Sequence, residues 1–288
     1  SMGLEENLIN ENTTFTCNGA VGVSGTTIHC WRRGGHGTET FAQGLCNSCN
    51  PFFIHIGQLL GPDKFFKYFE SFGFTERTGI DLPGESRSIY YTAEQLNPVE
   101  LATESFGQNF SITPIQMITA MAAVANGGRL MQPYLVSDIL NPDGSILQHT
   151  EPVCRRQVIK PETSETMREM MEAVVLYGGG RNARIQGYRV GGKSGTSQKL
   201  DSADEKARIA SFVAVAPIDD PQFLCLVCLD EPHSWTTAGG SLSAPVCAEV
   251  LEQTLVYKGV PRTTEAPAAS TAETAADLPA DGDSFDGA

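Results

Sequence analysis

The sequence predicts an α+β fold in which helices cover a mostly antiparallel sheet. Helical patterns dominate the first two thirds of the chain, and three short β-rich runs then follow one another at 188–198, 208–216 and 222–229. A turn signal at 219–221 separates the last two runs, so they are expected to form an antiparallel meander. Several helices followed by sequential strands are typical of a helical layer packed on a sheet.

The first elements are a β-like stretch and two helical stretches. Residues 13–32 are rich in Thr, Val and Gly, which predicts a β-hairpin. Residues 38–61 are predicted to be helical around a break at Pro51. The aromatic side chains of 62–73 recur at helical spacing, so this stretch should bury one face in the core.

Capping signals predict where the next helices begin. Thr92 and Thr113 each stand three residues before a Gln, which makes a capping box in both places. The helix over 113–125 is apolar nearly all round and should therefore be buried. Two more helices are expected at 161–176 and 243–257.

Composition indicates one globular domain with an acidic tail. The chain has 288 residues, 41% apolar and 19% charged, and a net charge of -14. With no Lys and Arg cluster to bind phosphates, a nucleic-acid partner is not expected. Residues 262–288 have almost no large apolar side chains and are predicted to be a disordered tail. Residues 1–2 are interpreted as a cloning remnant and 3–261 as the domain.

Eight cysteines raise the questions of zinc and of disulfides. The C-x-x-C pairs at 46–49 and 225–228 resemble half zinc sites, but they lie far apart and the second pair falls in an apolar strand. A shared zinc site is therefore not expected, and nothing else in the sequence requires a metal. Cys17 and Cys30 flank the predicted hairpin and are candidates for a disulfide.

The run Gly191–Ser197 (GGKSGTS) allows two chemical readings. Together with Gly187 it fits G-x-x-x-x-G-K-S, the nucleotide phosphate loop. That loop needs a helix directly after Lys-Ser, because the helix N-terminus supplies amides to the phosphate. Here Gly195 and a polar stretch follow Ser194, so the phosphate-loop reading is disfavoured.

The alternative reading is a sheet edge that grips a peptide for acyl transfer. Lys193 brings positive charge, Gly195 allows close backbone approach, and Thr196 offers a hydroxyl to a terminal carboxylate. Such chemistry needs a second polar cluster that moves protons, which Ser48 and Asn50 could supply. Taken alone, Ser48 is as well explained as the N-cap of the following helix.

Longer stretches carry a resemblance to a known family. They occur in one order and read GLCNSCNPFFIHIGQLLG, RTGIDLPGE, SFGQNFSITPIQMITAMAAVANGG, YRVGGKSGTSQ, ASFVAVAPIDDP and GGSLSAPV. From about Gly3 to Pro261 the chain closely resembles the transpeptidase domain of class B penicillin-binding proteins. The stretch CWRRGGHGTETFAQGL is most similar to the sporulation-specific members, with the division enzymes close behind. The resemblance implies the penicillin-binding-protein/β-lactamase-like fold.

The family is known for three motifs, and the resemblance implies roles for those matched here. Ser48 and Asn50 fit Ser-x-Asn, in which the serine relays a proton toward the leaving amine and the asparagine binds the substrate amide. Lys193 opens the Lys-Ser-Gly motif and steadies the proton network of Ser48. These three residues are the expected catalytic residues.

The substrate is expected to lie along the same strand. The resemblance implies substrate binding by Ser194, Gly195 and Thr196, with Thr196 on the carboxylate and its amide forming half of an oxyanion hole. The implied partners are a peptidoglycan stem peptide and β-lactams, with wall-synthesis proteins as further partners, and no cofactor. The parent protein is expected to be anchored upstream, on the extracytoplasmic face of the bacterial membrane.

One departure concerns the nucleophile. No serine in the sequence has a lysine three residues later, so the family's Ser-x-x-Lys motif is not present. The resemblance places that motif upstream of Gly3, and this chain is therefore expected to be an inactive fragment of a D,D-transpeptidase that lacks the nucleophile helix. The alternatives are a non-enzymatic β-lactam or muropeptide sensor or scaffold of the same fold, and a carboxypeptidase or β-lactamase.

Overall fold

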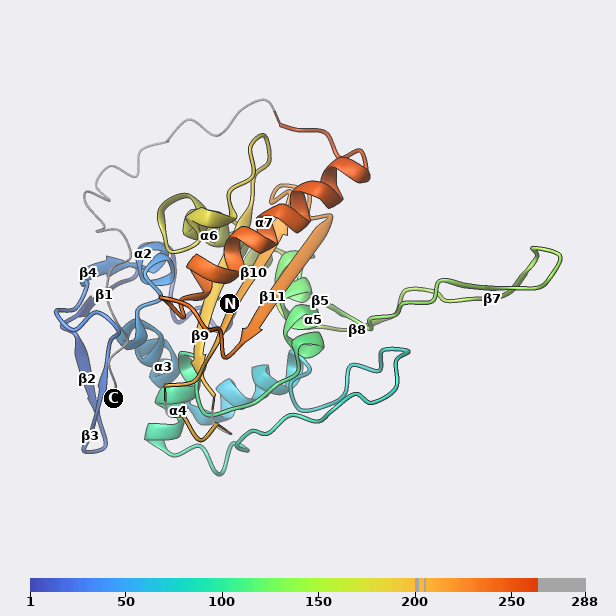
Figure 1. The fold of residues 1–288 in the computed structure, drawn as a ribbon. Coiled ribbons are helices and arrows are strands. Elements are labelled where there is room, and N and C mark those ends of the chain that lie inside the picture. Colours follow the sequence, from blue (N-terminus) through green and yellow to red (C-terminus); the bar gives the residue numbers. More distant parts are fainter. Residues whose placement is uncertain (200–201, 205, 264–288) are drawn as a thin grey trace.

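The fold is an α+β domain built around a small antiparallel sheet, as predicted (Figure 1). The computed structural model describes residues 1–199, 202–204 and 206–263. The predicted tail at 262–288 lies outside the described residues except for its first two positions. Within the described ranges, no helix is both long enough and apolar enough to span a membrane.

The central sheet has the strand order β11-β10-β9. Its strands are β9 (Gly191–Gln198), β10 (Arg208–Ala216) and β11 (Phe223–Asp230), which confirms the antiparallel meander. Because β9 is extended from Gly191 to Gln198, no helix begins at Ser194, and the phosphate-loop reading is wrong.

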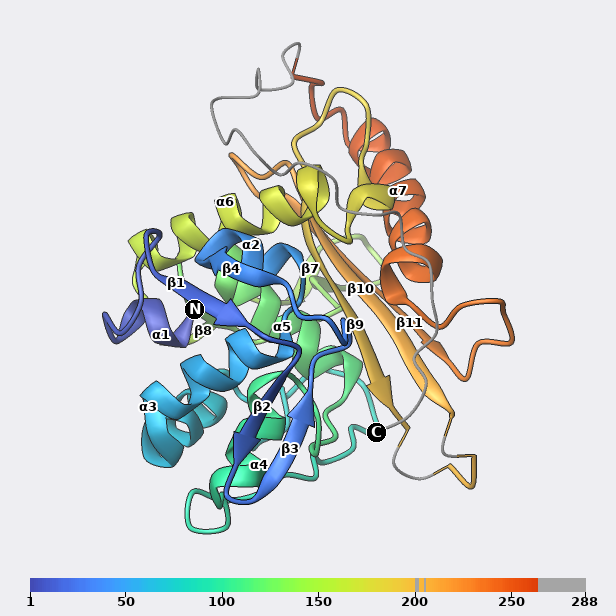
Figure 2. The same ribbon diagram turned by 90° about the vertical axis from the view of Figure 1, so that its left-hand side faces the viewer.

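Helices cover both faces of this sheet (Figures 1 and 2). The helix α7 (Gly239–Tyr257) packs on one face, while α5 (Pro114–Ala125) and α6 (Pro161–Tyr177) pack on the other. Successive β10 residues alternate between two cores, as a strand requires: Phe212 packs in the cluster with α7, and Val215 in the cluster with α5 and α6. Packing on both faces thereby holds β9, which carries the predicted site residues, in a fixed position.

The N-terminal segment forms a second β region beside the helices (Figure 2). β2 (Ala20–Val23) and β3 (Thr26–His29) form the hairpin expected within 13–32. β1 (Thr14–Cys17) instead pairs with the later strand β4 (Gly37–Thr40). The short α1 (Met2–Glu5) precedes these strands and contacts α3, which is described next.

Two helices follow β4, and the turn between them falls before Pro51. These are α2 (Phe41–Cys46) and α3 (Asn50–Ser71), so the break lies at 47–49 and Pro51 sits in the first turn of α3, where its missing N–H costs nothing. α3 is kinked at Gly61, whose φ of 71° is left-handed, so the predicted aromatic helix continues the same element.

One predicted helix start was confirmed and one was wrong. Thr113 caps α5 with the expected capping box. Thr92 caps only a turn, in which its N–H donates to the side chain of Gln95. The helix α4 (Pro98–Ser105) begins later, with Asn97 as its N-cap. Pro98 disfavours the helical conformation of the residue before it, so the helix cannot include Asn97.

The remaining elements connect these layers. The 3₁₀ turn η1 (Arg181–Ala183) joins α6 to the sheet, and β5 (Arg129–Met131) pairs with β8 (Cys154–Gln157) after α5. β6 (Asp138–Leu140) and β7 (Ile146–His149) form a hairpin that projects far from the body (Figure 1).

Candidate active site

Two segments far apart in sequence meet at one hydrogen bond. The Nζ of Lys193 donates to the Oγ of Ser48 at 2.8 Å, across 145 positions of sequence, and also to the carbonyl of Ser194 at 2.9 Å. The two motif residues Ser48 and Lys193 therefore lie in direct hydrogen-bond contact. This contact joins the α2–α3 turn to the first half of β9.

Ser48 occupies a turn that the sequence did not reveal. Its φ of 49° lies in the left-handed region, which a non-glycine residue adopts only when its surroundings require it. The N–H of Ser48 donates to the carbonyl of Leu45, and the N–H of Cys49 to that of Gly44, which closes the turn after α2. The N-cap of α3 is Cys49, so the reading of Ser48 as a helix cap is wrong.

Asn50 and its neighbours tie this turn to the N-terminal β region. The Nδ2 of Asn50 donates to the carbonyl of His29 at 3.1 Å. Trp31 Nε1 donates to the carbonyl of Asn47 at 2.8 Å, and Asn47 Nδ2 donates to Glu39 at 2.5 Å. We call Ser48, Cys49 and Asn50 the corner. Its supports at Trp31, Asn47 and Glu39 were missed by sequence reasoning, since they follow no motif of their own.

Burial changes the acid–base behaviour of Lys193. Removal of water from around the ammonium group lowers its pKa from 10.5 to about 8, with the nearby Cys46 acting weakly in the opposite direction. A lysine with this pKa exchanges its proton easily near neutral pH. It can therefore take part in proton transfer through Ser48 as well as supply positive charge.

β9 presents an open edge beside this lysine. Its only strand partner within the described sheet is β10, so its other edge pairs with no described strand. Gly195 lies opposite Ser211, and a Cβ at Gly195 would come within 2.6 Å of the Ser211 Oγ. A side chain at position 195 would therefore have to displace the Ser211 hydroxyl, and glycine leaves room for close backbone approach.

The N-terminus of α7 lies against the end of this edge. The N–H of Gly239, the first residue of α7, donates to the Oγ1 of Thr196 at 3.3 Å. A Cβ at Gly239 would approach the Ser211 carbonyl to 2.0 Å, which explains the glycine there. A helix N-terminus favours negative charge nearby, so Thr196 stands where a carboxylate is stabilised.

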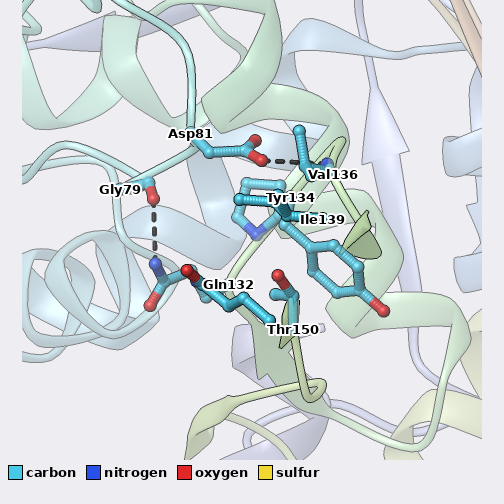
Figure 3. Close-up of a pocket in the computed structure, with 9 residues that line it drawn as sticks. Gly79, Asp81, Gln132, Tyr134, Val136, Ile139 and Thr150 are labelled. Atoms are coloured by element: carbon cyan, nitrogen blue, oxygen red, sulfur yellow. Dashed lines mark hydrogen bonds between the residues drawn. The ribbon is translucent and has the colours of Figure 1, made fainter. Parts of the chain in front are cut away.

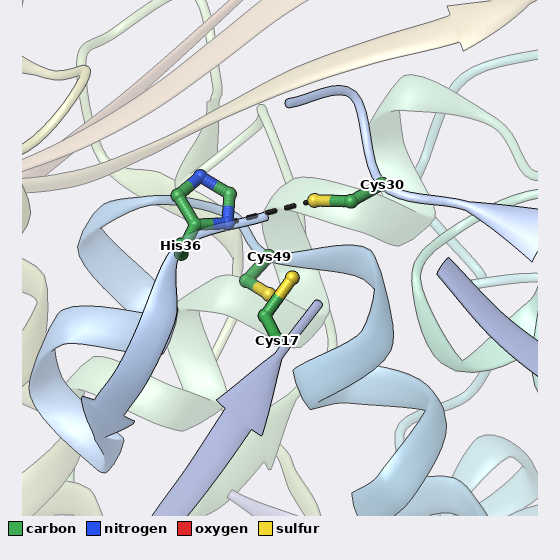
Figure 4. Close-up of side chains that lie close together, drawn as sticks. All are labelled: Cys17, Cys30, His36 and Cys49. Atoms are coloured by element: carbon green, nitrogen blue, oxygen red, sulfur yellow. Dashed lines mark hydrogen bonds between the residues drawn. The ribbon is translucent and has the colours of Figure 1, made fainter. Parts of the chain in front are cut away.

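A cysteine and histidine cluster includes Cys49, the middle residue of the corner (Figure 4). The ligand atoms of Cys17, Cys30, His36 and Cys49 all lie within 4.8 Å of one another. All eight cysteines are free thiols, and the pairs at 46–49 and 225–228 do not come together as a zinc site. The missed signal is His36, which completes the spacing C-x12-C-x5-H-x12-C.

The thiols of this cluster share hydrogen bonds. The Cys49 thiol donates to Cys30, which lowers the pKa of Cys30 and raises that of Cys49. The Sγ of Cys30 also lies 3.5 Å from the Nδ1 of His36. The cluster therefore holds three sulfur atoms and one imidazole close together, and these are ligand types that bind metal ions.

One surface cavity lies away from the predicted site residues. A cavity of about 280 Å³ lies at the base of the β6–β7 hairpin (Figure 3). Asp81 accepts a hydrogen bond from the Val136 N–H at 2.9 Å, and Gln132 donates to the Gly79 carbonyl at 2.8 Å. None of the six predicted site residues lines it.

Comparison with known families identifies the fold. The model of the penicillin binding protein transpeptidase domain matches residues 1–252. This chain belongs to the penicillin-binding protein transpeptidase family. The predicted resemblance and fold class are therefore confirmed, and the Ser48–Lys193 contact joins two of the motifs by which the resemblance was recognised.

Individual relatives in the transpeptidase family agree. Stage V sporulation protein D of Bacillus subtilis is 42% identical over 261 residues, which are 89% of this chain and 40% of that protein. Penicillin-binding protein PbpB of Mycolicibacterium smegmatis is 30% identical over 90% of this chain and 42% of its own length. The chain thus spans less than half the length of these relatives.

Solved transpeptidase structures have the same architecture. The apo transpeptidase domain of penicillin-binding protein 3 from Burkholderia pseudomallei superposes with a TM-score of 0.81 at 29% identity, covering 92% of this chain and 78% of that one. Penicillin-binding protein 3 of Mycobacterium tuberculosis, solved in complex with ampicillin, gives 0.82 at 26% identity over 93% and 62%.

Proposed function

We propose that this chain is part of a D,D-transpeptidase that cross-links peptidoglycan stem peptides through a serine acyl-enzyme. The hydrogen bond between Lys193 and Ser48 beside the open edge of β9 carries the proposal. It puts a proton-relaying pair next to backbone that can hold an extended peptide.

The substrate peptide would add to β9 as a further strand. Its main-chain groups would pair with the edge around Ser194 and Gly195, and its terminal carboxylate would lie at Thr196 near the N-terminus of α7. Asn50 would bind the peptide amide from the opposite side of the groove. The β-lactam ring would occupy the same place, as an acylating analogue of the peptide.

Proton transfer would then run through Ser48. Lys193, with a pKa near 8, can hold or release a proton within hydrogen-bond distance of the Ser48 hydroxyl, which would pass it to the leaving amine. The attacking hydroxyl would come from a Ser-x-x-Lys motif, which these 288 residues do not contain. We therefore expect the chain itself to form no acyl-enzyme.

The likeness to Stage V sporulation protein D supports a role in building the spore wall, on the extracytoplasmic side of the membrane. Other wall-synthesis proteins would be partners of the complete protein there.

Fluorescent penicillin tests the proposal. The 288-residue chain should give no covalent band, because loss of the nucleophile costs on the order of 10³-fold or more in rate. A longer chain that includes Ser-x-x-Lys should be labelled, and Lys193→Ala in that chain should slow labelling by at least ~100-fold. Labelling of the short chain, or normal labelling of the Lys193→Ala variant, would refute the assignment. A longer chain that binds penicillin but never turns over stem peptide would indicate a sensor.

A further inference from the structure

The cysteine and histidine cluster draws its four side chains from four separate places in the chain. Cys17 ends β1, Cys30 follows β3, His36 precedes β4, and Cys49 caps α3. The three cysteines are buried, and the His36 side chain is only 1% exposed. The side chains of these four residues thus lie together in the interior, and the three cysteines form no disulfide.

The distances fit a tetrahedral ion. With a zinc–sulfur bond of about 2.3 Å and a zinc–nitrogen bond of about 2.0 Å, tetrahedral geometry puts sulfur and nitrogen roughly 3.6 Å apart. The Cys30 Sγ and His36 Nδ1 are 3.5 Å apart, and every ligand atom lies within 4.8 Å of the others. Little movement is needed to bring all four to bonding distance.

Buried polar atoms beside the cluster also favour a bound cation. The Nε2 of His36 and the Oε2 of Glu39 are buried with no hydrogen-bond partner, and the Glu39 Oε2 lies 3.9 Å from the His36 Nδ1. Burying a polar oxygen with no hydrogen-bond partner, as at the Glu39 Oε2, is costly. A divalent cation at the thiols would offset that cost.

We propose that Cys17, Cys30, His36 and Cys49 bind one Zn²⁺ ion, and that this ion holds the corner in place. Three thiolates and one imidazole in tetrahedral array are a ligand set that zinc prefers. All four positions are taken by protein ligands, so the site is structural and leaves no position for substrate. Cys46, one half of the nearby C-x-x-C pair, is not a ligand.

The position of the ion explains how it reaches the active site. Cys49 is the middle residue of the corner, between Ser48 and Asn50. Cys30 follows His29, whose carbonyl accepts the hydrogen bond of Asn50. A metal bond to Cys30 and Cys49 therefore fixes both ends of that contact. Zinc here is a positioning group for the corner and takes no part in the chemistry.

Metal analysis of the 288-residue chain, purified in a thiol-free reductant and given one equivalent of zinc, tests the site. We expect one zinc per chain, a sulfur-to-cobalt charge-transfer band when Co²⁺ replaces it, and a fall in Tm on the order of 5 °C or more with a strong chelator. His36→Gln should reduce zinc content at least tenfold, while His36→Cys, which makes a four-cysteine site, should keep it. Cys154→Ser removes an exposed thiol outside the cluster and should leave zinc content unchanged.

A folded wild-type chain that takes up no zinc would overturn the proposal, whatever the variants do. Full zinc content in His36→Gln would overturn it as well. So would a protein mass two hydrogens below that expected for free thiols, because that mass would reveal a disulfide within the cluster that persists in the presence of the reductant. If His36→Gln fails to fold, the chelator experiment on the wild-type chain decides the question.

The effect on the corner rests on the proposed function and needs the longer chain that carries Ser-x-x-Lys. There, His36→Gln should slow penicillin labelling at least tenfold and His36→Cys should restore it. Zinc content is measured independently, so a zinc-loaded chain that never acylates would count against the proposed function only. Equal labelling of zinc-loaded wild type and zinc-free His36→Gln would refute the positioning role.

Discussion

Replacement of Lys193 by methionine should make the chain more stable at neutral pH while removing a residue proposed to be catalytic. Burial lowers the Lys193 pKa from 10.5 to about 8, so below pH 8 the folded protein carries a charge that would be better solvated in the unfolded chain. Between pH 8 and 10.5 the unfolded chain binds more protons than the folded one. The stability contribution of Lys193 therefore rises with pH through that window.

The size of this effect follows from the pKa change. One pH unit corresponds to about 1.4 kcal/mol, so the ceiling is about 3 kcal/mol. The residue is mostly buried but keeps some exposure, and water screens part of the charge, so we expect about 2 kcal/mol between pH 7 and pH 10. Loss of the hydrogen bonds to Ser48 and to the Ser194 carbonyl offsets part of the gain at pH 7, which leaves Lys193→Met more stable by about 1 kcal/mol.

Urea denaturation at several pH values measures both quantities. The stability advantage of Lys193→Met over wild type should shrink and then reverse as pH rises. Because the two proteins share all other titratable groups, taking the difference in unfolding free energy cancels the contributions of those groups. Lys258→Met, at an exposed lysine, is the matched control and should show no such trend. Parallel pH profiles for wild type and Lys193→Met would show that burial does not depress this pKa.

Two further predictions concern the supports of the site. Gly239→Ala should destabilise the fold by about 2 kcal/mol, because the added Cβ would meet the Ser211 carbonyl at 2.0 Å. Gly34→Ala is the control, since a Cβ there has nothing within 4 Å and should change Tm by less than about 1 °C. Equal losses of Tm in the two variants would contradict this packing. Burial raises the pKa of Glu104 to about 7, so stability should fall as pH rises from 4.5 to 7, and Glu104→Gln should be more stable than wild type by about 2 kcal/mol at pH 8 and by little at pH 4.5 in urea titrations. A Glu104→Gln gain of equal size at both pH values would rule out a titration effect.

The strand meander and the main helices could be predicted because each follows from local pattern. β10 alternates between two cores and α5 begins at a capping box, and both signals lie within a few residues. The start of α4 was misplaced because two capping residues compete within six positions. Pro98 decides between them by restricting Asn97, which a capping pattern alone does not weigh.

The site was predictable only where motifs pointed to it. Ser48 and Lys193 were identified through their motifs, and the structure joins them. The left-handed turn at Ser48 has no local signal, since no glycine marks it. His36 was overlooked for a different reason: its three cysteine neighbours lie in separate elements, and the pairing of β1 with β4 that gathers them could not be read from sequence.

The uncovered margin of β9 carries a hazard for solubility. Unpaired amides and carbonyls on a sheet border recruit strands from other copies of a protein, which is how many aggregates begin. The composition of β9 works against that outcome, because its eight residues include three glycines and no large apolar side chain. A strand of another copy thus gains little free energy by pairing with β9. Only a ligand that also contacts the polar groups around the groove binds there stably.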